Sequence, residues 1–207
     1  MSERMIERMS EPTREVELKA RVEDVGAARR NIQNAGGLLV FDGSLHDRIY
    51  DTPDGMLAAS DFVLRIRSYL SRLGITAHLD WKGPTLREGG FKVRSELTTG
   101  VTDPDQLAAI LNRLGFGIIG QIDRKIMQYE ILDVETDART VIRFEQYPRM
   151  DALVEVEGSQ AGIERAISAL GIPRAMFSAD RLADFVRAYE ARTGRRAAIC
   201  DQDLESG

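Results

Sequence analysis

Six segments of the chain alternate charged and apolar residues with a period of two, the pattern of a β-strand with one charged face. In REVELKARV, Glu15, Glu17 and Lys19 share one face, and Val16 and Leu18 share the other. The alternation recurs in FVLRIRSY, AHLDWK, FKVRSEL, TVIRFEQ and LVEVEG. Arginine pairs and glutamate pairs fall on different strands, so the sequence predicts a sheet whose charged face is segregated by sign.

Two architectures accommodate such faces. An antiparallel sheet commonly exposes one face to water, and for any single strand this is the simpler interpretation. A closed barrel fits the whole set better, because closure turns the charged faces into a lumen and leaves the apolar faces for helices to cover. A lumen with acids on some strands and bases on others would hold metal ions and polyanions together.

The remaining periodicity indicates one α+β domain. Period-two stretches predict about eight strands, at Arg14–Val22, Leu45–Asp51, Phe62–Tyr69, Ile75–Lys82, Phe91–Leu97, Gly120–Leu132, Thr140–Gln146 and Ala152–Glu157. Helical spacing predicts helices at Val25–Ala35, Asp105–Leu114, Ala161–Leu170 and Ala179–Arg192. We therefore predict a closed or nearly closed eight-stranded antiparallel β-barrel with a polar lumen and helices outside, formed by residues 14–194. Residues 1–13 and 195–207 are polar and are expected to be mobile ends.

Composition narrows the classes of function. A formal net charge of −5 argues against a protein that mainly coats duplex nucleic acid. One cysteine excludes an internal disulfide and favours a reducing compartment, and two histidines make a Cys/His zinc site a poor expectation. No apolar run approaches the roughly 20 residues that span a bilayer. We expect a cytoplasmic monomer or homodimer with no nucleic-acid or membrane partner, in which carboxylates hold any metal.

The charged faces offer ligands for a metal and for phosphates. Two carboxylates at i and i+2 of a strand point the same way, and Mg²⁺ and Mn²⁺ take oxygen ligands. The candidate metal ligands are Glu15, Glu17, Glu145, Glu155 and Glu157. Arginine presents forked donors to phosphate oxygens, and lysine presents a point charge. The candidate substrate ligands are Lys19, Arg65, Arg67, Lys82, Arg94, Arg124 and Arg143. A single phosphate group would not need seven basic side chains.

In the order in which they occur along the chain, the charged segments resemble those of the CYTH superfamily, the triphosphate tunnel metalloenzymes. REVELKARV carries the family's E-x-E-x-K motif, and DRIYDTPDGMLAASDFVLRIR is similar to its aromatic-Asp-Thr hairpin and Leu-Arg-x-Arg strand. LDWKGP and FKVRSEL resemble its strand lysine before Gly-Pro and its R-x-E strand. RFEQYPRMDALVEVEG resembles its last metal segment, an acid followed ten residues later by E-x-E. The resemblance spans residues 14 to about 190.

Three positions depart from the family pattern. Glu145 stands where the family usually has Asp, which keeps the charge, so metal binding should survive. Ile126 stands at the second of two basic positions in QIDRKIMQYE, so a phosphate contact is expected to be missing there unless Arg143 compensates. Asp180, which follows Ser178 by two residues, replaces a frequent Tyr, and this weakens the expectation of substrate contacts from that segment.

The resemblance implies an enzyme that uses Mg²⁺ or Mn²⁺ to act on a triphosphate, with Lys19, Arg65, Arg67 and Glu145 as catalytic residues. In a triphosphatase, water attacks the terminal phosphorus; in a class IV adenylyl cyclase, the ribose hydroxyl of ATP attacks the α-phosphorus and pyrophosphate leaves. The sequence has no motif that reads a base, so hydrolysis of tripolyphosphate, thiamine triphosphate or a nucleoside triphosphate is preferred. The cyclase and a non-catalytic polyphosphate- or nucleotide-binding module stay as alternatives.

Overall fold

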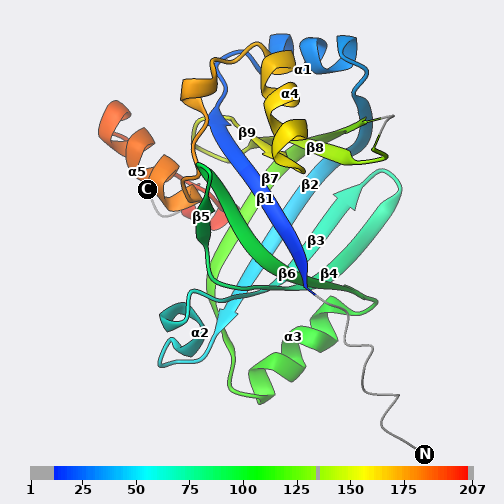
Figure 1. Ribbon diagram of the computed structural model, residues 1–207. Helices are drawn as coiled ribbons and strands as arrows, with labels where there is room; N and C mark the ends of the chain where they lie inside the picture. Colours follow the sequence, from blue (N-terminus) through cyan, green and yellow to red (C-terminus); the bar gives the residue numbers. More distant parts are fainter. Residues whose placement is uncertain (1–11, 134–135, 205–207) are drawn as a thin grey trace, which may run out of the picture.

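A computed structural model describes residues 12–133 and 136–204 of the chain (Figure 1). Its strands are β1 (Thr13–Arg21), β2 (Leu38–Asp51), β3 (Val63–Ser71), β4 (Gly74–Lys82), β5 (Leu86–Glu88), β6 (Phe91–Val101), β7 (Gly117–Leu132), β8 (Arg139–Gln146) and β9 (Leu153–Glu157). Its helices are α1 (Val25–Asn34), α2 (Met56–Ala59), α3 (Pro104–Arg113), α4 (Gln160–Leu170) and α5 (Leu182–Thr193), with short 3-10 helices η2 (Arg174–Met176) and η3 (Asp201–Leu204). The expectation of a mobile segment 1–13 falls outside the described residues except for its last two.

Eight of the strands close into a barrel. The order is β1-β9-β8-β7-β2-β3-β4-β6, and β6 pairs in turn with β1, so the sheet meets itself. Every pairing is antiparallel. The ninth strand, β5, lies outside the ring on β6. The predicted α+β architecture with an eight-stranded antiparallel barrel is confirmed, and β5 is an element that the alternation did not reveal.

Helices α1 and α4 cover the outer face of one side of the barrel, where Figure 1 places them next to each other. Leu18 of β1 and Val156 of β9 are fully buried there, in one cluster with Ile32 of α1 and Ile163 of α4. A separate cluster joins Leu111 of α3 to the outer faces of β2 and β3. The apolar strand faces therefore point outward into helices, as the alternation predicts, and the charged faces are left for the inside.

Side-chain caps define where the covering helices begin. The Asp103 carboxylate accepts a hydrogen bond of 2.8 Å from the Gln106 backbone N–H, and Pro104 follows at the first helical position of α3. Asp24 caps α1 in the same way through Ala27, at 2.8 Å. The helix predicted at Asp105–Leu114 is thus observed one residue earlier, from Pro104 to Arg113.

The C-terminal segment, which the sequence places outside the folded domain as a mobile tail, lies against the barrel. β7 pairs with β8 only over residues 125–132, and the Asp123 backbone N–H, just before that stretch, donates to the Ile199 carbonyl at 2.8 Å. Ala198 pairs with Arg149 in an isolated antiparallel bridge and is fully buried, and Cys200 is buried too. The segment therefore covers a seam between β7 and the end of β8.

β2 begins at Leu38, seven residues before the strand predicted at Leu45–Asp51. Residues 38–40 are all apolar and lack alternation, and in the structure Leu38, Leu39 and Val40 are all exposed.

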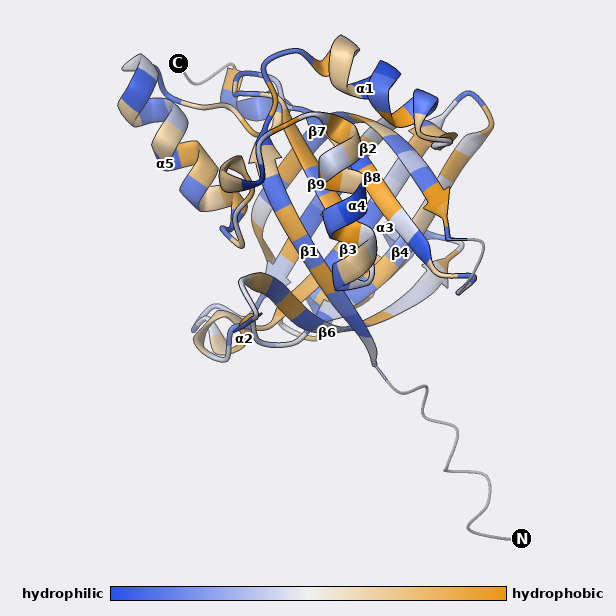
Figure 2. Ribbon diagram, turned by 45° about the horizontal axis from the view of Figure 1, so that its top comes forward, coloured by the Kyte–Doolittle hydropathy of each residue, from blue (hydrophilic) through white to orange (hydrophobic). Residues whose placement is uncertain are grey.

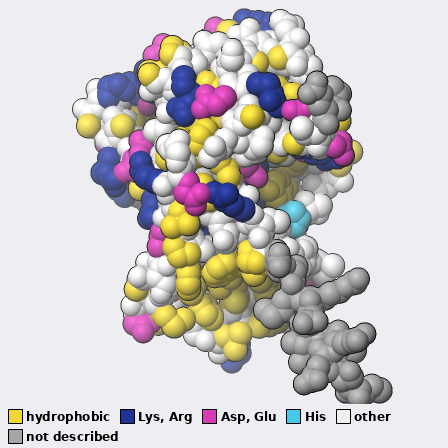
Figure 3. All heavy atoms as spheres, viewed as in Figure 1, with side chains coloured by type: hydrophobic (Ala, Val, Ile, Leu, Met, Phe, Trp, Pro, Cys, Tyr) yellow, Lys and Arg dark blue, Asp and Glu magenta, His cyan; other side chains and the backbone are white. Residues whose placement is uncertain are grey.

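Hydrophobic side chains gather on the lower half of the face shown in Figure 3, where α3 lies in Figure 1. Ile110 of α3 and Leu114, which follows its last residue, are large exposed apolar residues. No helix of the described residues is both long enough and apolar enough to cross a lipid bilayer.

Gly43 of β2 lies against the backbone of β3, and we expect Gly43→Ala to destabilise the fold. A Cβ at this position would clash with the Leu70 backbone carbonyl, which cannot rotate away. Overpacking of this kind costs about 1–3 kcal/mol. Chemical unfolding of the variant should show this loss, whereas Gly100→Ala on β6, where a Cβ meets nothing within 4 Å, should be close to the parent. Equal stability of both variants would contradict the close approach.

Candidate active site

The barrel brings the charged strand faces into one lumen. Glu17, Arg65 and Glu145 come from three different strands, yet each is at most 9% exposed. The outer faces of the same strands carry the apolar residues of the two clusters under the helices. Figure 2 shows the resulting alternation of hydrophilic and hydrophobic bands along the strands. The lumen is therefore an ionised interior inside an apolar shell.

Two adjacent strands, β1 and β9, form an acidic wall. Their register places Glu17 opposite Glu157 and Lys19 opposite Glu155. A lysine neutralises each of three glutamates: Lys82 Nζ lies 2.8 Å from Glu15, Lys92 Nζ lies 2.6 Å from Glu17, and Lys19 Nζ lies 2.8 Å from Glu155. Lys82 also contacts Glu96. Lysines from β1, β4 and β6 thus pair with the carboxylates of this wall.

The acidic wall is short of positive charge. Burial, reinforced by repulsion from Glu155 and Glu15, raises the pKa of Glu17. Burial also raises the pKa of Glu15, and burial with repulsion from Glu15 raises the pKa of Glu157 to about 7. Glu155 behaves differently, because Lys19 and Arg143 outweigh its burial and hold its pKa well below the usual range. Burial and mutual repulsion therefore outweigh the lysines at Glu15 and Glu17, and they disfavour the charged form of Glu157 as well.

The opposite part of the lumen is a basic wall organised by Asp47 of β2. Arg67 donates to its carboxylate from Nε at 2.7 Å and from Nη2 at 2.8 Å, and Arg124 donates from Nη1 at 3.1 Å. Arg65 lies 3.4 Å away. Although burial opposes it, these three arginines hold the pKa of Asp47 well below its ordinary value. Asp47 is therefore a fixed negative charge that gathers three guanidinium groups from two strands.

Other acids orient the same arginines. Asp80 accepts two hydrogen bonds from Arg65, at 3.0 Å from Nε and 2.6 Å from Nη2, and a third from Thr98. Arg67 uses Nε and Nη2, one edge of its guanidinium, on Asp47. A guanidinium carries five N–H donors, so a carboxylate that takes one edge fixes the direction of the others. The acids of the basic wall thus act as positioning residues for arginine.

Glu145 joins the two walls. Its carboxylate accepts hydrogen bonds from Arg124 at 2.8 Å, from Tyr147 at 2.8 Å and from Lys19 at 3.3 Å. Although burial opposes it, Lys19 and Arg124 lower the pKa of Glu145. Burial and the charge of Glu145 raise the pKa of the Tyr147 phenol, which stays protonated and donates. With three donors on a carboxylate that is 1% exposed, Glu145 anchors Lys19 and Arg124 in place.

All the residues predicted for the site meet around this lumen. A cavity of about 300 Å³ is lined by Glu15, Glu17, Lys19, Arg65, Arg67, Lys82, Arg94, Arg124, Arg143 and Glu155. Glu157 lines a smaller hollow of about 160 Å³ that shares Arg65, Arg67 and Lys82 with the cavity. Glu145 stands behind the cavity wall and reaches it through Lys19 and Arg124.

The two remaining predicted phosphate ligands, Arg94 and Arg143, are also held by partners. Arg94 donates to three backbone carbonyls, those of Gly83 at 2.6 Å, Asp61 at 2.8 Å and Lys82 at 3.5 Å, so it holds the β4–β5 connection to the lumen wall. Arg143 donates to Gln128 at 3.1 Å and to Glu155. Ile126 faces the inside and is 1% exposed, so the position that departs from the family pattern contributes no charge.

The prediction omitted several residues of the network, among them Asp47, Asp80, Lys92 and Tyr147. Asp80 and Lys92 lie on the charged faces of predicted strands, so the same alternation could have identified them. Asp47 gave a weaker signal, because Leu45 and Ile49 flank it on its own face and make that face look apolar. Tyr147 follows the end of β8, where the period-two pattern no longer assigns a direction.

The acidic wall fits a hard divalent cation by its donor chemistry. Its glutamates offer carboxylate oxygens, the ligands that Mg²⁺ and Mn²⁺ prefer. Burial and mutual repulsion raise the pKa values of Glu15, Glu17 and Glu157, and a cation would counter both effects. Among residues 12–133 and 136–204, no three acidic, histidine or cysteine side chains stand as a ready-made metal cluster. Lysines occupy the spaces between the carboxylates, so a metal would have to replace lysine contacts.

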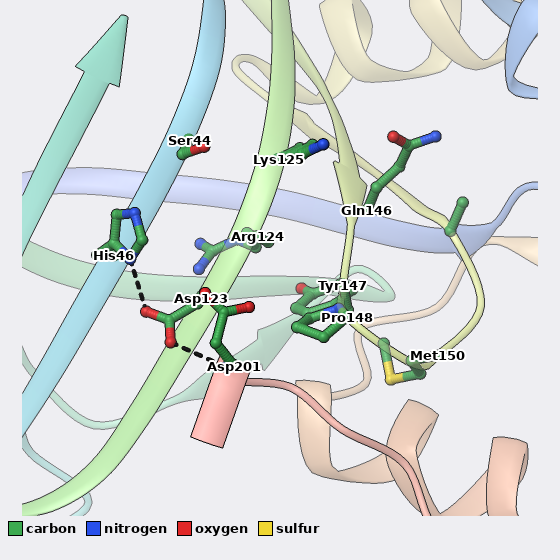
Figure 4. A pocket seen from close by; sticks show the side chains of 11 residues that line it. Ser44, His46, Asp123, Arg124, Lys125, Gln146, Tyr147, Pro148, Met150 and Asp201 are labelled. Carbon is green, nitrogen blue, oxygen red and sulfur yellow. Dashed lines mark hydrogen bonds and ion pairs between the residues drawn. The ribbon is translucent and has the colours of Figure 1, made fainter. Parts of the chain in front are cut away.

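A larger hollow of about 470 Å³ lies at the seam between β7 and the β8–β9 loop (Figure 4). There His46 Nδ1 lies 2.8 Å from Asp123, whose carboxylate also accepts from Arg48 at 2.8 Å and from the Asp201 backbone N–H at 3.1 Å. These contacts tie the C-terminal segment to β2 and β7. Arg124 and Tyr147 line both this hollow and the cavity of the lumen. The lumen is the candidate active site, because the arginines and glutamates converge there.

Comparisons with known proteins agree with this architecture. A family model described as the CYTH domain matches residues 13–167. No curated protein matches the chain. A suspected adenylate cyclase from Vibrio parahaemolyticus has a TM-score of 0.69 at 18% identity, covering 85% of this chain and 99% of its own. A suspected adenylyl cyclase from Hippeastrum that has a dominant triphosphatase activity gives a TM-score of 0.59 at 17% identity. The match covers 84% of this chain and 96% of the Hippeastrum chain. A Pyrococcus horikoshii protein gives 0.64 at 18% identity, covering 83% and 98%. At these identities the structures share the fold.

We expect Asp47→Asn to lower the free energy of unfolding by about 3–5 kcal/mol, because it leaves buried guanidinium groups without their shared anion. Asp42→Asn is the matched control, since Asp42 lies on the same strand and is exposed. Urea unfolding at neutral pH measures both. If Asp47→Asn unfolded at the same urea concentration as the control, the carboxylate would not be the centre of the basic wall.

Proposed function

The chain belongs to the CYTH family, and from that membership we propose that it is a divalent-metal-dependent enzyme that cleaves a phosphoanhydride bond of a triphosphate held in the lumen. The supporting observation is the division of one lumen into an acidic wall, on β1 and β9, and a basic wall around Asp47. A pure polyanion binder would need only the basic wall. The acidic wall adds a place for a cation beside the phosphates, which favours catalysis over the non-catalytic module.

The favoured reaction is hydrolysis. One water adds to the terminal phosphorus, the bond from that phosphorus to the bridging oxygen breaks, and the products are orthophosphate, a diphosphate and a released proton. In our assignment, Arg65, Arg67 and Arg124 bind non-bridging oxygens and neutralise the charge that develops on the transferred group. Lys19 adds a fixed positive charge, because Glu145 and Glu155 outweigh its burial and raise its pKa well above the ordinary value. Glu145 positions Lys19 and Arg124.

The metal would be held by the acidic wall, by Glu15, Glu17, Glu155 and Glu157, with Mg²⁺ or Mn²⁺ as the cation. When bound, such an ion polarises phosphoryl oxygens and neutralises negative charge. The lysines that now separate the glutamates would then be free to turn to the phosphates. Lys82, which bridges Glu15 and Glu96, is the clearest case, since it lines both hollows of the lumen.

Cyclisation of ATP is the second candidate. In that reaction the ribose 3′-hydroxyl attacks the α-phosphorus, the α–β phosphoanhydride breaks, and cyclic AMP and pyrophosphate form. The same lining would bind the triphosphate, and the names of the Vibrio and Hippeastrum relatives keep this reaction in view. The dominant triphosphatase activity reported for the Hippeastrum protein supports hydrolysis as the first choice.

The reaction is tested by offering tripolyphosphate, thiamine triphosphate, ATP and GTP with Mg²⁺, with Mn²⁺ and with a chelator. We expect orthophosphate release that depends on the metal. Pyrophosphate and cyclic AMP formed in equal amounts from ATP would assign the cyclase instead. Binding of these triphosphates without any product would identify the module that does no chemistry.

Glu17→Gln should abolish metal-dependent turnover and leave the barrel folded, because it removes one charge from the acidic wall and nearly preserves volume. Glu23→Gln is the control, since the Glu23 side chain is 79% exposed outside the lumen. Turnover against Mn²⁺ concentration and Mn²⁺ calorimetry measure the effect, with circular dichroism as the check on folding. A Glu17→Gln enzyme as active as the parent at limiting Mn²⁺ would refute Glu17 as a ligand.

Arg67→Ala should weaken triphosphate binding or turnover by roughly one to two orders of magnitude, since a charge-assisted hydrogen bond contributes about 1.5–3 kcal/mol. Arg65→Ala should act similarly. The metal affinity of the free protein should change much less. Arg72→Ala, at the exposed end of the β3–β4 hairpin, is the control. Calorimetry with tripolyphosphate gives the affinities, and values equal to the control for both lumen variants would remove the basic wall from the site.

A further inference from the structure

The large aliphatic side chains that line the charged cavity are Ile49, Val63, Ile122 and Leu182. We refer to them as the apolar collar. They share the cavity of about 300 Å³ with Arg65, Arg67 and Arg124, and each is partly exposed to it. None belongs to the two hydrophobic clusters under the helices. The collar is therefore apolar surface that the fold leaves uncovered inside its own binding cavity.

The collar stands directly beside the basic wall. β7, β2 and β3 are consecutive in the barrel, so Ile122, Ile49 and Val63 come from three neighbouring strands. Ile122 pairs across the sheet with Asp47, and Ile49 pairs with Arg65. A group that contacts the collar is therefore within one residue pair of the arginines that would bind phosphate.

A further side of the cavity comes from the start of α5. The helix predicted there, Ala179–Arg192, was expected to lie outside the barrel. Leu182 and Ala183 line the cavity instead, next to Arg181. Arg181 donates to the Asp61 carboxylate at 2.8 Å, an ion pair that fixes an exposed guanidinium at the cavity. A planar guanidinium stacks on aromatic faces as well as pairing with acids. The α5 end of the cavity thus combines apolar contact with a flat cation.

The chemistry of the collar does not match an inorganic substrate. Tripolyphosphate is charged along its whole length and gains nothing from isoleucine and valine, which would instead displace water from its oxygens. A ring joined to a triphosphate presents both characters in sequence, apolar at one end and polyanionic at the other. Burial of apolar area contributes about 25 cal/mol per Å², so exposed collar residues favour such a ligand.

We propose that the apolar collar binds the base of a nucleoside triphosphate and gives this protein a preference for organic over inorganic triphosphates. The proposal rests on the proposed function, because it takes the arginines of the lumen as the triphosphate site. It concerns recognition of the substrate and holds for hydrolysis and cyclisation alike.

The test compares three substrates that share the triphosphate: ATP, ribose 5-triphosphate, which lacks the base, and tripolyphosphate. For the parent we expect kcat/KM to be highest for ATP. Ile49→Thr and Ile122→Thr keep the β-branched shape that suits a strand but place a hydroxyl in the collar. Each should lower the ratio of kcat/KM for ATP to that for tripolyphosphate by about tenfold, the discrimination typical of small changes in an apolar pocket.

Two controls separate recognition from damage to the fold. Ile49→Val and Ile122→Val keep the collar apolar and should retain most of the preference for ATP. Ile119→Thr places the same change on β7, at a side chain that is 59% exposed and does not line the cavity, and should retain the parental ratio. An unchanged ratio in both threonine variants of the collar, or a parent that prefers tripolyphosphate, would overturn the proposal.

Failure of the proposed function would look different. If the parent released no product from any of the three substrates, the ratio of its calorimetric affinities for ATP and tripolyphosphate would be used in place of the ratio of kcat/KM values. Tighter binding of ATP that is lost in Ile49→Thr would then support the collar in a protein that does no chemistry. Equal binding of the two compounds would overturn it.

Discussion

Charge balance inside a closed barrel is the constraint on which the rest of this structure depends. Pairing of β6 with β1 closes the sheet, and the charged side chains of the inner face lose most of their contact with bulk water. A buried ion is strongly unfavourable unless it is paired and hydrogen bonded. Asp47 meets this requirement for three arginines at once, and Glu145 meets it for Lys19 and Arg124.

The two walls meet the constraint to different degrees, and this difference points to the ligand. Around Asp47 the pKa shifts favour the charged forms, so the basic wall is internally balanced and its arginines are held in fixed directions. On the acidic wall the pKa values of Glu15, Glu17 and Glu157 are raised, so the pairs there are incomplete. A cation would complete the pairs of the acidic wall, and it would stand beside a polyanion bound by the free N–H groups of the arginines.

Much of this arrangement could be predicted from the sequence, because period-two alternation fixes which side chains share a face. Once β1 and β3 are strands, Glu17 must point the same way as Lys19, and Arg65 the same way as Arg67. The outward packing of Leu18 and Val156 follows for the same reason and is confirmed. The order of the motifs then resembled one family, and the family model agrees.

What the alternation could not predict depends on contacts between distant segments. Asp47 looked like one polar residue on an apolar strand face, and only the register of β2 with β3 shows that it meets Arg67. The same holds for Ile49 and Ile122, which belong to the lumen although they are apolar. The segment around Ala198 has no periodicity at all, and its place at the seam follows from backbone bonds to Asp123 and Arg149.

The central claim is that one lumen binds a metal on one wall and a triphosphate on the other. A crystal structure of the protein soaked with Mn²⁺ and a non-hydrolysable ATP analogue tests this directly, since manganese is located by its anomalous scattering. The account predicts manganese among Glu15, Glu17, Glu155 and Glu157, with phosphates against Arg65, Arg67 and Arg124. Nucleotide and metal in the outer hollow beside His46 and Asp123, with the lumen holding only its own ion pairs, would contradict it.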